Sequence, residues 1–355
     1  MKKELLVASA LVSTLGLAGI AEAASSSMSG HQRVGVTGSD KDSTANDTMG
    51  ASRQSTFSVS ISETTDSGIK ISTGFDLAEE NGGLDASGLT LTFTDGSKLD
   101  LIEAGTAAGS HVASVPGASG EQGISATTTN AAPTSLTMGH GADNVGFEYH
   151  TAADAFGIDG FKASVSASFN GDTSAVSSTT ATLEGSYSAG VTYVTDAGDS
   201  TVTIGGGLSG SEIKKTGTQL SNDQEGFHIG ITAVTGDLTV GIGFGDGDTF
   251  DDDGSGTTNT PTEIDGSVTT AGIKYVSGDI TLAVGHVSGE AKDSATPGTP
   301  DTTDDSHDAT SASVTYAVAS GVTAVVGYTT VDQNNDGVSS TDGGSAFYIG
   351  ANMSF

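Results

Sequence analysis

Side chains able to carry out enzymatic chemistry are scattered along this sequence and form no known catalytic motif. None of the seven histidines belongs to an H-E-x-x-H metal-binding motif, and no G-x-S-x-G nucleophile elbow occurs. The glycine run at residues 204–210, IGGGLSG, continues an alternating strand pattern and opens no helix, so it predicts no phosphate-binding loop. A Ser and a His paired across neighbouring strands is the one catalytic arrangement that the sequence leaves open. We therefore expect a protein that is not an enzyme.

Two acidic stretches carry the oxygen ligands that calcium prefers. Residues 332–337, DQNNDG, match the first half of a D-x-[DN]-x-[DN]-G loop, although Gly343 stands where such a loop needs its bidentate glutamate. Residues 244–256, FGDGDTFDDDGSG, form the second stretch. The candidate ligands are Asp332, Asn334 and Asp336 in the first stretch and Asp246, Asp248, Asp251 and Asp253 in the second. Bound Ca²⁺ would relieve the repulsion between these carboxylates. Acidic loops that are merely solvated are the alternative, and the fold itself requires no cofactor.

Most of the chain alternates between apolar residues and small polar ones. In residues 55–62, STFSVSIS, apolar side chains alternate with serines, and residues 161–169, FKASVSASF, repeat the pattern. A period of two is that of a β-strand with one apolar face and one polar face. Strands are expected near residues 27–37, 51–63, 68–78, 87–93, 98–104, 144–151, 161–170, 183–194, 200–210, 226–234, 238–246, 267–276, 280–290, 309–318, 322–331 and 345–355.

The connections between these strands alternate in length. One set consists of tight turns that contain Gly with Asp or Ser. These are TDSG at Thr65, TDGS at Thr94, DAGD at Asp196, TGD at Thr235, SGD at Ser277 and ASG at Ala319. The other set is long, polar and acidic, and includes residues 211–225, 247–266, 291–308 and 333–344. About sixteen antiparallel strands, with short turns at one end and long loops at the other, are typical of a transmembrane β-barrel with periplasmic turns and extracellular loops.

A closed barrel also accounts for the two faces of the strands. Within a membrane every backbone N–H and C=O must be satisfied inside the protein, so a sheet spans the bilayer only when it closes. The apolar face then contacts lipid, and the Ser, Thr, Gly and Lys face lines a water-filled interior. A soluble β-sandwich is the alternative, but its core would need more large side chains than the Ala, Val and Gly of these strands supply.

Composition and the N-terminus indicate an exported protein. The chain has 355 residues, no cysteine and a net charge of −32, from 44 Asp and Glu against 12 Lys and Arg. Such a chain repels nucleic acid and attracts cations. Residues 1–23 combine two lysines, an apolar stretch and an A-x-A cleavage site, which predicts a cleaved signal peptide rather than a membrane-spanning helix. Residues 24–355 then form one barrel domain.

The C-terminal residues, SAFYIGANMSF, hold the cleanest alternation in the chain. One face carries Phe347, Ile349, Ala351, Met353 and Phe355. The last strand of a barrel must pair with the first, which explains why this terminus lacks the polar residues of a frayed end. Outer-membrane barrels commonly end in an aromatic residue that the assembly machinery binds. These five residues are therefore the expected assembly signal.

On the signal peptide, the sixteen strands, the long loop after the fifth strand and the terminal Phe355, the chain resembles the Gram-negative general porins, especially the α-proteobacterial type. The resemblance covers the whole mature chain. It implies a homotrimeric outer-membrane channel for passive diffusion of ions and small hydrophilic solutes, whose partners are membrane lipid and the assembly machinery. Porin aromatic girdles often include Trp, which this chain lacks. The tyrosines available for a girdle are Tyr149, Tyr187, Tyr193, Tyr275, Tyr316, Tyr328 and Tyr348.

The loop at residues 105–143 is too long to be an ordinary connection. It follows the fifth strand, where porins fold a loop into the barrel to narrow the pore. Its residues are mostly small, and its titratable side chains are only His111, Glu121, His140 and Asp143. The resemblance implies that this segment is the constriction loop. A disordered surface loop is the alternative.

Strand alternation directs several basic side chains toward the barrel interior. General porins carry a basic wall across the pore from the constriction loop. The candidates for this wall are Arg33, Arg53, Lys70, Lys98, Lys162 and Lys274. Scattered charges that keep the interior polar are the alternative. Because acidic residues at the pore mouths outnumber these basic ones, we expect a preference for cations.

A second class of function fits the acidic loops. A calcium-binding secreted or surface β-protein, such as an adhesin, would use the same Asp- and Gly-rich segments. It would have no need of the terminal Phe355 or of a lipid-facing apolar stripe. The sequence therefore favours the channel.

Overall fold

The protein is seen in a computed structural model that describes residues 24–41, 48–78, 84–86, 88–102, 105–118, 132–137, 146–168, 181–215, 222–251, 262–292, 305–334 and 343–355. The predicted signal peptide, residues 1–23, lies outside these ranges. The strands are β1 (Ser25–Lys41), β2 (Thr48–Thr64), β3 (Lys70–Ala78), β4 (Leu84–Ala86), β5 (Leu89–Thr92), β6 (Lys98–Leu101), β7 (Gly146–His150), β8 (Phe161–Ser168), β9 (Ala181–Ala197), β10 (Ser200–Lys215), β11 (Asn222–Thr235), β12 (Leu238–Asp251), β13 (Thr262–Ser277), β14 (Ile280–Lys292), β15 (Asp305–Ala319), β16 (Val322–Asn334) and β17 (Gly344–Ser354).

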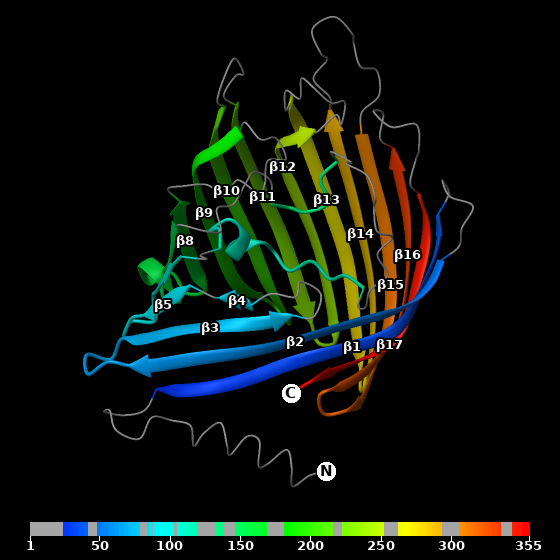
Figure 1. Ribbon diagram of the computed structural model, residues 1–355, viewed down its shortest axis with the longest axis horizontal. Coiled ribbons are helices and arrows are strands. Elements are labelled where there is room, and N and C mark those ends of the chain that lie inside the picture. The colour runs from blue at the N-terminus through cyan, green and yellow to red at the C-terminus, as the bar shows by residue number, and fades with distance from the viewer. Residues whose placement is uncertain are drawn as a thin grey trace, which may run out of the picture.

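These strands form one closed antiparallel ring (Figure 1). From β5 to β17 each strand pairs with the next one in the chain, and β1, β2 and β3 do the same. β3 pairs with β5 at one end and with β4 at the other, so β4 and β5 share one position in the ring. β17 pairs with β1 and closes it. The barrel thus has the sixteen positions that the alternation predicts.

The predicted tight turns are confirmed, and each contains one glycine in the left-handed region that L-residues avoid. The six glycines are Gly68, Gly96, Gly198, Gly236, Gly278 and Gly321, with φ between 56° and 88°. The described part of the chain contains two short helices. Between β7 and β8 the chain forms η2 (Ala155–Gly157), and η1 (Gly109–His111) lies in the loop after β6. No helix in the described part of the chain is long and apolar enough to cross a membrane.

The strands reach further into the acidic connections than the sequence predicts. β10 continues to Lys215 and β12 to Asp251, although the alternation places their ends at residues 210 and 246. The extension of β12, residues 247–251, is rich in Asp and Gly, which are poor strand formers. The extension of β10, residues 211–215, is instead rich in charged residues. In the barrel, pairing with the neighbouring strand satisfies their backbone groups and keeps them extended.

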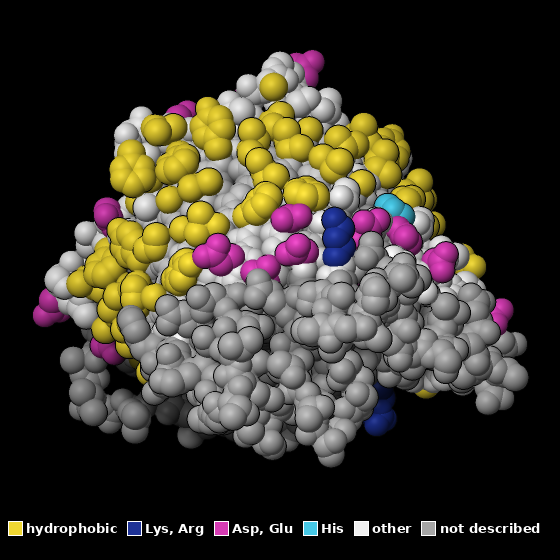
Figure 2. Space-filling model, turned by 90° about the horizontal axis from the view of Figure 1, so that it is seen from above, with side chains coloured by type: hydrophobic (Ala, Val, Ile, Leu, Met, Phe, Trp, Pro, Cys, Tyr) yellow, Lys and Arg dark blue, Asp and Glu magenta, His cyan; other side chains and the backbone are white. Residues whose placement is uncertain are grey.

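The register divides the side chains into an outer and an inner face, because directly opposed residues of an antiparallel pair lie on the same side. Val34 and Ile204 belong to the outer face, and each is more than one third exposed. Their neighbours Gly35 and Gly205 belong to the inner face. Figure 2 shows apolar side chains gathered over one continuous area of the surface, with acidic side chains along its border. The apolar surface therefore faces out of the barrel, as lipid contact requires.

The tyrosines follow this division with one exception. Six of them lie on the outer face, each at least 37% exposed: Tyr149, Tyr187, Tyr193, Tyr275, Tyr316 and Tyr328. Tyr348 is fully buried, and its register partner Thr37 belongs to the inner face. Its ring lies against Gly35, where an added Cβ would come within 2.6 Å of the ring. The prediction of a girdle position for Tyr348 is therefore wrong.

Candidate functional site

The described parts of the loop after β6, residues 105–118 and 132–137, lie inside the barrel, against inner-face glycines of β9 to β14. A Cβ added to Gly205 would come within 2.3 Å of the His111 carbonyl oxygen, and one added to Gly272 within 1.8 Å of the Pro116 carbonyl oxygen. The other glycines in contact with the loop include Gly190, Gly207, Gly230, Gly241, Gly243, Gly285 and Gly289. Because these positions have no side chain, the loop backbone can lie directly on the wall.

Wall side chains satisfy the loop's backbone groups at its start. The Ala107 N–H donates to Ser166 Oγ at 3.0 Å, and the Ala108 N–H donates to Ser188 Oγ at 3.2 Å. His228 Nε2 donates to the Ala108 carbonyl oxygen at 2.9 Å. Both alanines are almost completely buried. An irregular segment inside a barrel must have its polar groups paired, and these contacts supply that pairing.

The far end of the described loop is held by apolar contacts. Leu136 is 5% exposed and packs against Val268 of β13, with Val112 and Val287 at the edge of the same cluster. Val268 lies on the inner face, opposite Gly245 and Gly289. Because this contact lies on the inner face of the barrel, it cannot contribute to lipid binding. It anchors the loop to the inner wall.

His111 makes the most specific contact between loop and wall. It ends η1, and its side chain is buried between β8 and β9. Nδ1 lies 2.7 Å from Thr192 Oγ1, and Nε2 lies 2.8 Å from Ser164 Oγ. In a neutral imidazole one ring nitrogen donates and the other accepts, and both hydroxyls can play either part. The ring is therefore fully paired without carrying a charge.

The surroundings of His111 also favour the neutral ring. Burial, together with the electrostatic repulsion that protonated His150, protonated His228 and Lys162 would exert on an imidazolium, lowers the pKa of His111 to about 4. Desolvation is the largest of these causes, because it disfavours the charged imidazolium. At neutral pH the ring is uncharged and the loop contact is intact.

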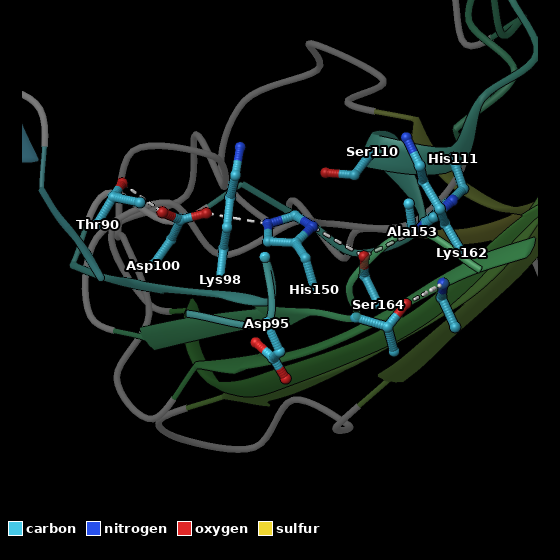
Figure 3. A pocket seen from close by; sticks show the side chains of 13 residues that line it. Thr90, Asp95, Lys98, Asp100, Ser110, His111, His150, Ala153, Lys162 and Ser164 are labelled. Carbon is cyan, nitrogen blue, oxygen red and sulfur yellow. Dashed lines mark hydrogen bonds and ion pairs between the residues drawn. The ribbon is translucent and has the colours of Figure 1, made fainter. Parts of the chain in front are cut away.

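A cavity of about 610 Å³ opens beside His111 on the inner wall (Figure 3). Lys98 and Asp100 of β6, His150 of β7 and Lys162 of β8 contribute to its lining. A second cavity of about 360 Å³ adjoins it and shares Asp100. Charged side chains of both signs line the first cavity, and Asp76 and Asp100 line the second.

The predicted basic residues divide between the two faces of the barrel. Five of them belong to the inner face: Arg33, Lys70, Lys98, Lys162 and Lys274. Arg53 is directly opposite Val34, which is 49% exposed on the outer face. Its expected pore-lining position is therefore wrong, because the register of β2 on β1 puts odd-numbered residues of β2 on the outside.

The other predicted residues of the loop and of the acidic stretches are only partly within the described chain. Glu121, His140, Asp143, Asp336 and Asp253 lie outside it, and the side chain of Asp251 does too. Asp332 and Asn334 belong to the extended strand β16, and Asp246 and Asp248 to β12. The Glu225 N–H donates to Asp248 Oδ2 at 2.7 Å. A calcium loop of the EF-hand type needs a curled backbone, so the expected loop conformation is wrong for Asp332 and Asn334.

The C-terminal face is arranged as the alternation predicts. Phe347, Ile349, Ala351, Met353 and Phe355 follow the outer side of β17 and its end. The Phe355 N–H donates to the Gly30 carbonyl oxygen at 3.1 Å, and the Gly30 N–H donates back to Phe355 at 3.1 Å. The last residue is thus hydrogen-bonded to the first strand.

Three polar residues of the wall were not singled out from the sequence. Asp100, Glu148 and His150 lie side by side on the inner faces of β6 and β7. The alternation with Phe147 and Tyr149 already indicates that Glu148 and His150 face the interior. Their proximity to Asp100 could not be predicted, because it depends on the pairing of β6 with β7, which are joined through the long loop.

Comparisons with known proteins agree with this architecture. A family model described as Gram-negative porin matches residues 7–336. No curated protein matches the sequence. Among solved structures, the anion-selective porin from Comamonas acidovorans aligns with a TM-score of 0.64 and 15% identity, covering 94% of this chain and all of that one. The outer membrane channel DcaP of Acinetobacter baumannii aligns at 0.67 with 12% identity, over 94% and 97% of the two chains.

The trimer form of OmpT, an outer membrane protein of Vibrio cholerae, aligns with a TM-score of 0.60 and 18% identity, over 94% of this chain and all of that one. At these identities the structures show a shared fold, while the family match covers nearly the whole sequence. With its closed sixteen-position barrel and the loop on its inner wall, the chain belongs to the family of Gram-negative porins, proteins of the outer membrane.

Proposed function

We propose that the barrel is a water-filled channel for passive diffusion of ions and small hydrophilic solutes, narrowed by the loop at residues 105–143. The observation that carries this proposal is the seating of the loop on the glycines of β9 to β14. A loop anchored by backbone contacts, hydrogen bonds and an apolar cluster holds a fixed position, so it sets a fixed pore cross-section. The family membership supports a channel over the secreted, adhesin-like alternative.

We also infer a preference for cations. The basic side chains of the inner face are offset by acidic ones on the same face, including Asp76, Asp100, Glu148 and Asp305. The chain as a whole has a net charge of −32, so most of its negative charge lies beyond that balanced wall. Rings and mouths of one sign of charge set ion selectivity in wide pores. The anion-selective porin with the same fold indicates that side chains, not the barrel, decide the sign.

The resemblance to trimeric outer-membrane proteins supports a homotrimer as the assembled form. Closed symmetric assemblies bury the same surface on each subunit, and a barrel offers such a surface on its outer wall. Chemical cross-linking of the folded protein in detergent, followed by denaturing electrophoresis, tests this: a ladder that stops at three subunits is expected.

Liposome swelling tests the channel itself. Vesicles that contain the folded protein should swell in neutral sugars at rates that fall steeply with sugar size, because an anchored loop fixes the pore diameter. Vesicles made with heat-denatured protein are the control. Equal rates for small and large sugars would contradict a loop-narrowed pore, and no swelling at all would contradict the channel.

A further inference from the structure

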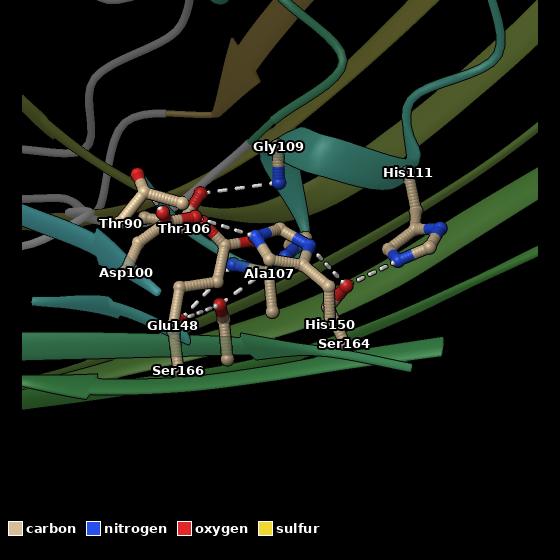
Figure 4. Close-up of polar contacts among 12 residues, drawn as sticks. Thr90, Asp100, Thr106, Ala107, Gly109, His111, Glu148, His150, Ser164 and Ser166 are labelled. Atoms are coloured by element: carbon tan, nitrogen blue, oxygen red, sulfur yellow. Dashed lines mark hydrogen bonds and ion pairs between the residues drawn. The ribbon is translucent and has the colours of Figure 1, made fainter. Parts of the chain in front are cut away.

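Asp100, Glu148 and His150 bring three metal-ligating atoms together on the inner wall (Figure 4). His150 Nε2 lies 2.9 Å from Asp100 Oδ2 and 3.6 Å from Glu148 Oε1, and all three ligand atoms lie within 4.8 Å of one another. Tetrahedral coordination at metal–ligand distances of about 2.0–2.2 Å separates neighbouring ligand atoms by about 3.3–3.6 Å. The observed separations bracket that range, so small side-chain rotations would complete a three-ligand site.

The buried carboxylate of Glu148 gives this cluster its strongest indication of a ligand. Glu148 is only 2% exposed, and its Oε1 accepts no hydrogen bond from any described residue. A carboxylate oxygen that is removed from water without a partner is costly. If His150 Nε2 carries a proton, it can donate that proton to only one carboxylate. Asp100 is nearer than Glu148, so Glu148 Oε1 would still lack a partner. A cation between the three atoms would satisfy Glu148 as well.

A chain of hydrogen bonds behind His150 fits the same assignment. His150 Nδ1 lies 2.9 Å from Ser164 Oγ, and Ser164 Oγ lies 2.8 Å from His111 Nε2. If Nδ1–H of His150 donates to Ser164, the serine hydroxyl donates to His111. His150 Nε2 then carries no proton, and its lone pair faces the carboxylates of Asp100 and Glu148. Metal-bound histidines usually donate their second N–H to such a partner, which fixes both the tautomer and the ring orientation.

The cluster also has an open side. The side chains of Asp100 and His150 are 25% and 24% exposed, and both line the 610 Å³ cavity of the barrel interior. Lys98 and Lys162 line the same cavity, and of the described residues neither ammonium has a carboxylate within 4.0 Å. Figure 3 shows the Lys98 nitrogen directed away from the contact between Asp100 and His150. An ion from the channel can therefore reach the three ligands, and water can complete its coordination.

The geometry points to a binding site for a divalent transition-metal ion of the Zn²⁺ type, held by Asp100 Oδ2, Glu148 Oε1 and His150 Nε2 on the channel wall. One imidazole and two carboxylates suit Zn²⁺ better than Mg²⁺, which prefers an octahedron of oxygen ligands and keeps its water. Because the site adds two positive charges to the wall, metal binding reduces the cation current. This inference concerns a site on the inner wall and stands whether or not the channel prefers cations.

The test is a titration of the folded, EDTA-treated protein in detergent with ZnCl₂ in the presence of a chromophoric chelator. The chain has no cysteine, so thiolates contribute nothing to the signal. His150→Gln and Glu148→Gln each remove one ligand with little change of volume, and each should weaken the strongest Zn²⁺ site at least about tenfold. Ser164→Ala, which removes the partner of His150 Nδ1, should weaken it by a smaller factor.

His286→Gln is the matched control. His286 Nε2 lies 3.9 Å from Asp308 Oδ1, both side chains are about half exposed, and no third ligand joins them among the described residues. This variant should titrate like the wild type. Folding of every variant is checked by heat-modifiable mobility on electrophoresis. If Glu148→Gln fails to fold, the more exposed His150→Gln still decides.

Two outcomes would overturn the site: equal Zn²⁺ titrations for wild type, His150→Gln and His286→Gln, or loss of the strongest site in His286→Gln alone. Co²⁺ gives a second readout, because coordination by an imidazole and two carboxylates produces visible ligand-field absorption. That absorption is expected in the wild type and in His286→Gln, and it should be absent in His150→Gln. Mg²⁺ at equal concentration should not displace it.

Discussion

Gly205 of β10 faces the backbone of His111 so closely that a Cβ at position 205 would come within 2.3 Å of the His111 carbonyl oxygen. The neighbouring strand repeats the relationship, since a Cβ at Gly190 would come within 2.3 Å of the Ala107 carbonyl oxygen. Glycine at these positions is therefore a requirement of the inner loop rather than of the strands. The barrel wall is shaped to receive that loop.

Gly205→Ala should push the loop off the wall. Overpacking of a close contact costs about 1–3 kcal/mol, and here the strand is hydrogen-bonded on both sides, so the loop must move toward the pore. We expect a lower single-channel conductance with more current noise. Gly50→Ala is the control, because an added Cβ at this glycine of β2 would meet nothing within 4 Å. Identical conductance in the two variants would contradict the seating of the loop.

Acid should release the His111 contact. The buried ring has a pKa of about 4, below the ordinary value of 6.5, so the undocked loop binds a proton more readily than the docked one. The docked state is fully favoured above pH 6.5 and loses up to roughly 3 kcal/mol as the pH falls from 6.5 to 4. The titratable groups that face His111 are His150 on β7, Lys162 on β8 and His228 on β11.

The measurement is the channel current between pH 7 and pH 4, in wild type and in His111→Gln. Glutamine keeps hydrogen-bonding atoms on both sides of its amide but does not titrate in this range. The wild-type current should change as the pH falls, with a midpoint between pH 6.5 and pH 4. His111→Gln should lack this change. The same pH profile in both proteins would rule out His111 as the titrating group.

Tyr348 should stabilise the closure of the barrel. Its side chain is fully buried on the inner side of β17, against Gly35 and Gly350, and its hydroxyl donates to the Val34 carbonyl oxygen at 3.4 Å. Tyr348→Ala should cost about 3–5 kcal/mol of unfolding free energy, as truncation of a buried aromatic generally does. Tyr328→Ala removes a half-exposed outer tyrosine and is the comparison. Guanidinium unfolding in detergent measures both, and equal losses would contradict the assignment.

Phe355 should matter for assembly more than for stability. Its ring is 74% exposed, while its backbone is paired with Gly30. Phe355→Ser keeps the backbone hydrogen bonds and removes the aromatic ring, so the purified, refolded barrel should unfold at nearly the wild-type guanidinium concentration. In cells the amount of folded protein in the outer membrane should fall sharply. A normal amount in the membrane would show that the ring is not an assembly signal.

The sequence predicted the strands and turns well because both depend on local patterns. Alternation located all sixteen positions, and glycine with Asp or Ser marked the tight turns. The alternation ends β12 too early, before Gly247 and Asp248, because pairing with the neighbouring strand keeps these residues extended in spite of their low strand propensity. The inner face of Tyr348 follows from the alternation itself, since Phe347 and Ile349 point outward.

The site was less accessible from sequence, because it depends on which strands meet. The outer position of Arg53 follows from the alternation, since Phe57 and Val59 share its parity, and its pairing with Val34 confirms it. Asp100 and His150 are 50 positions apart and meet only because β6 pairs with β7. The glycines under the loop read as flexible or poor strand residues, and only the position of the loop backbone shows why they lack side chains.

Single-channel recording of the folded protein in a planar bilayer under a KCl gradient tests the central claim most directly. A water-filled barrel narrowed by an anchored loop should give discrete, uniform conductance steps, and the excess of acidic residues should give a reversal potential of the sign expected for cations. A reversal potential of anion sign would leave the channel in place and contradict the cation preference. Protein that is demonstrably folded and inserted but produces no steps would contradict the channel itself.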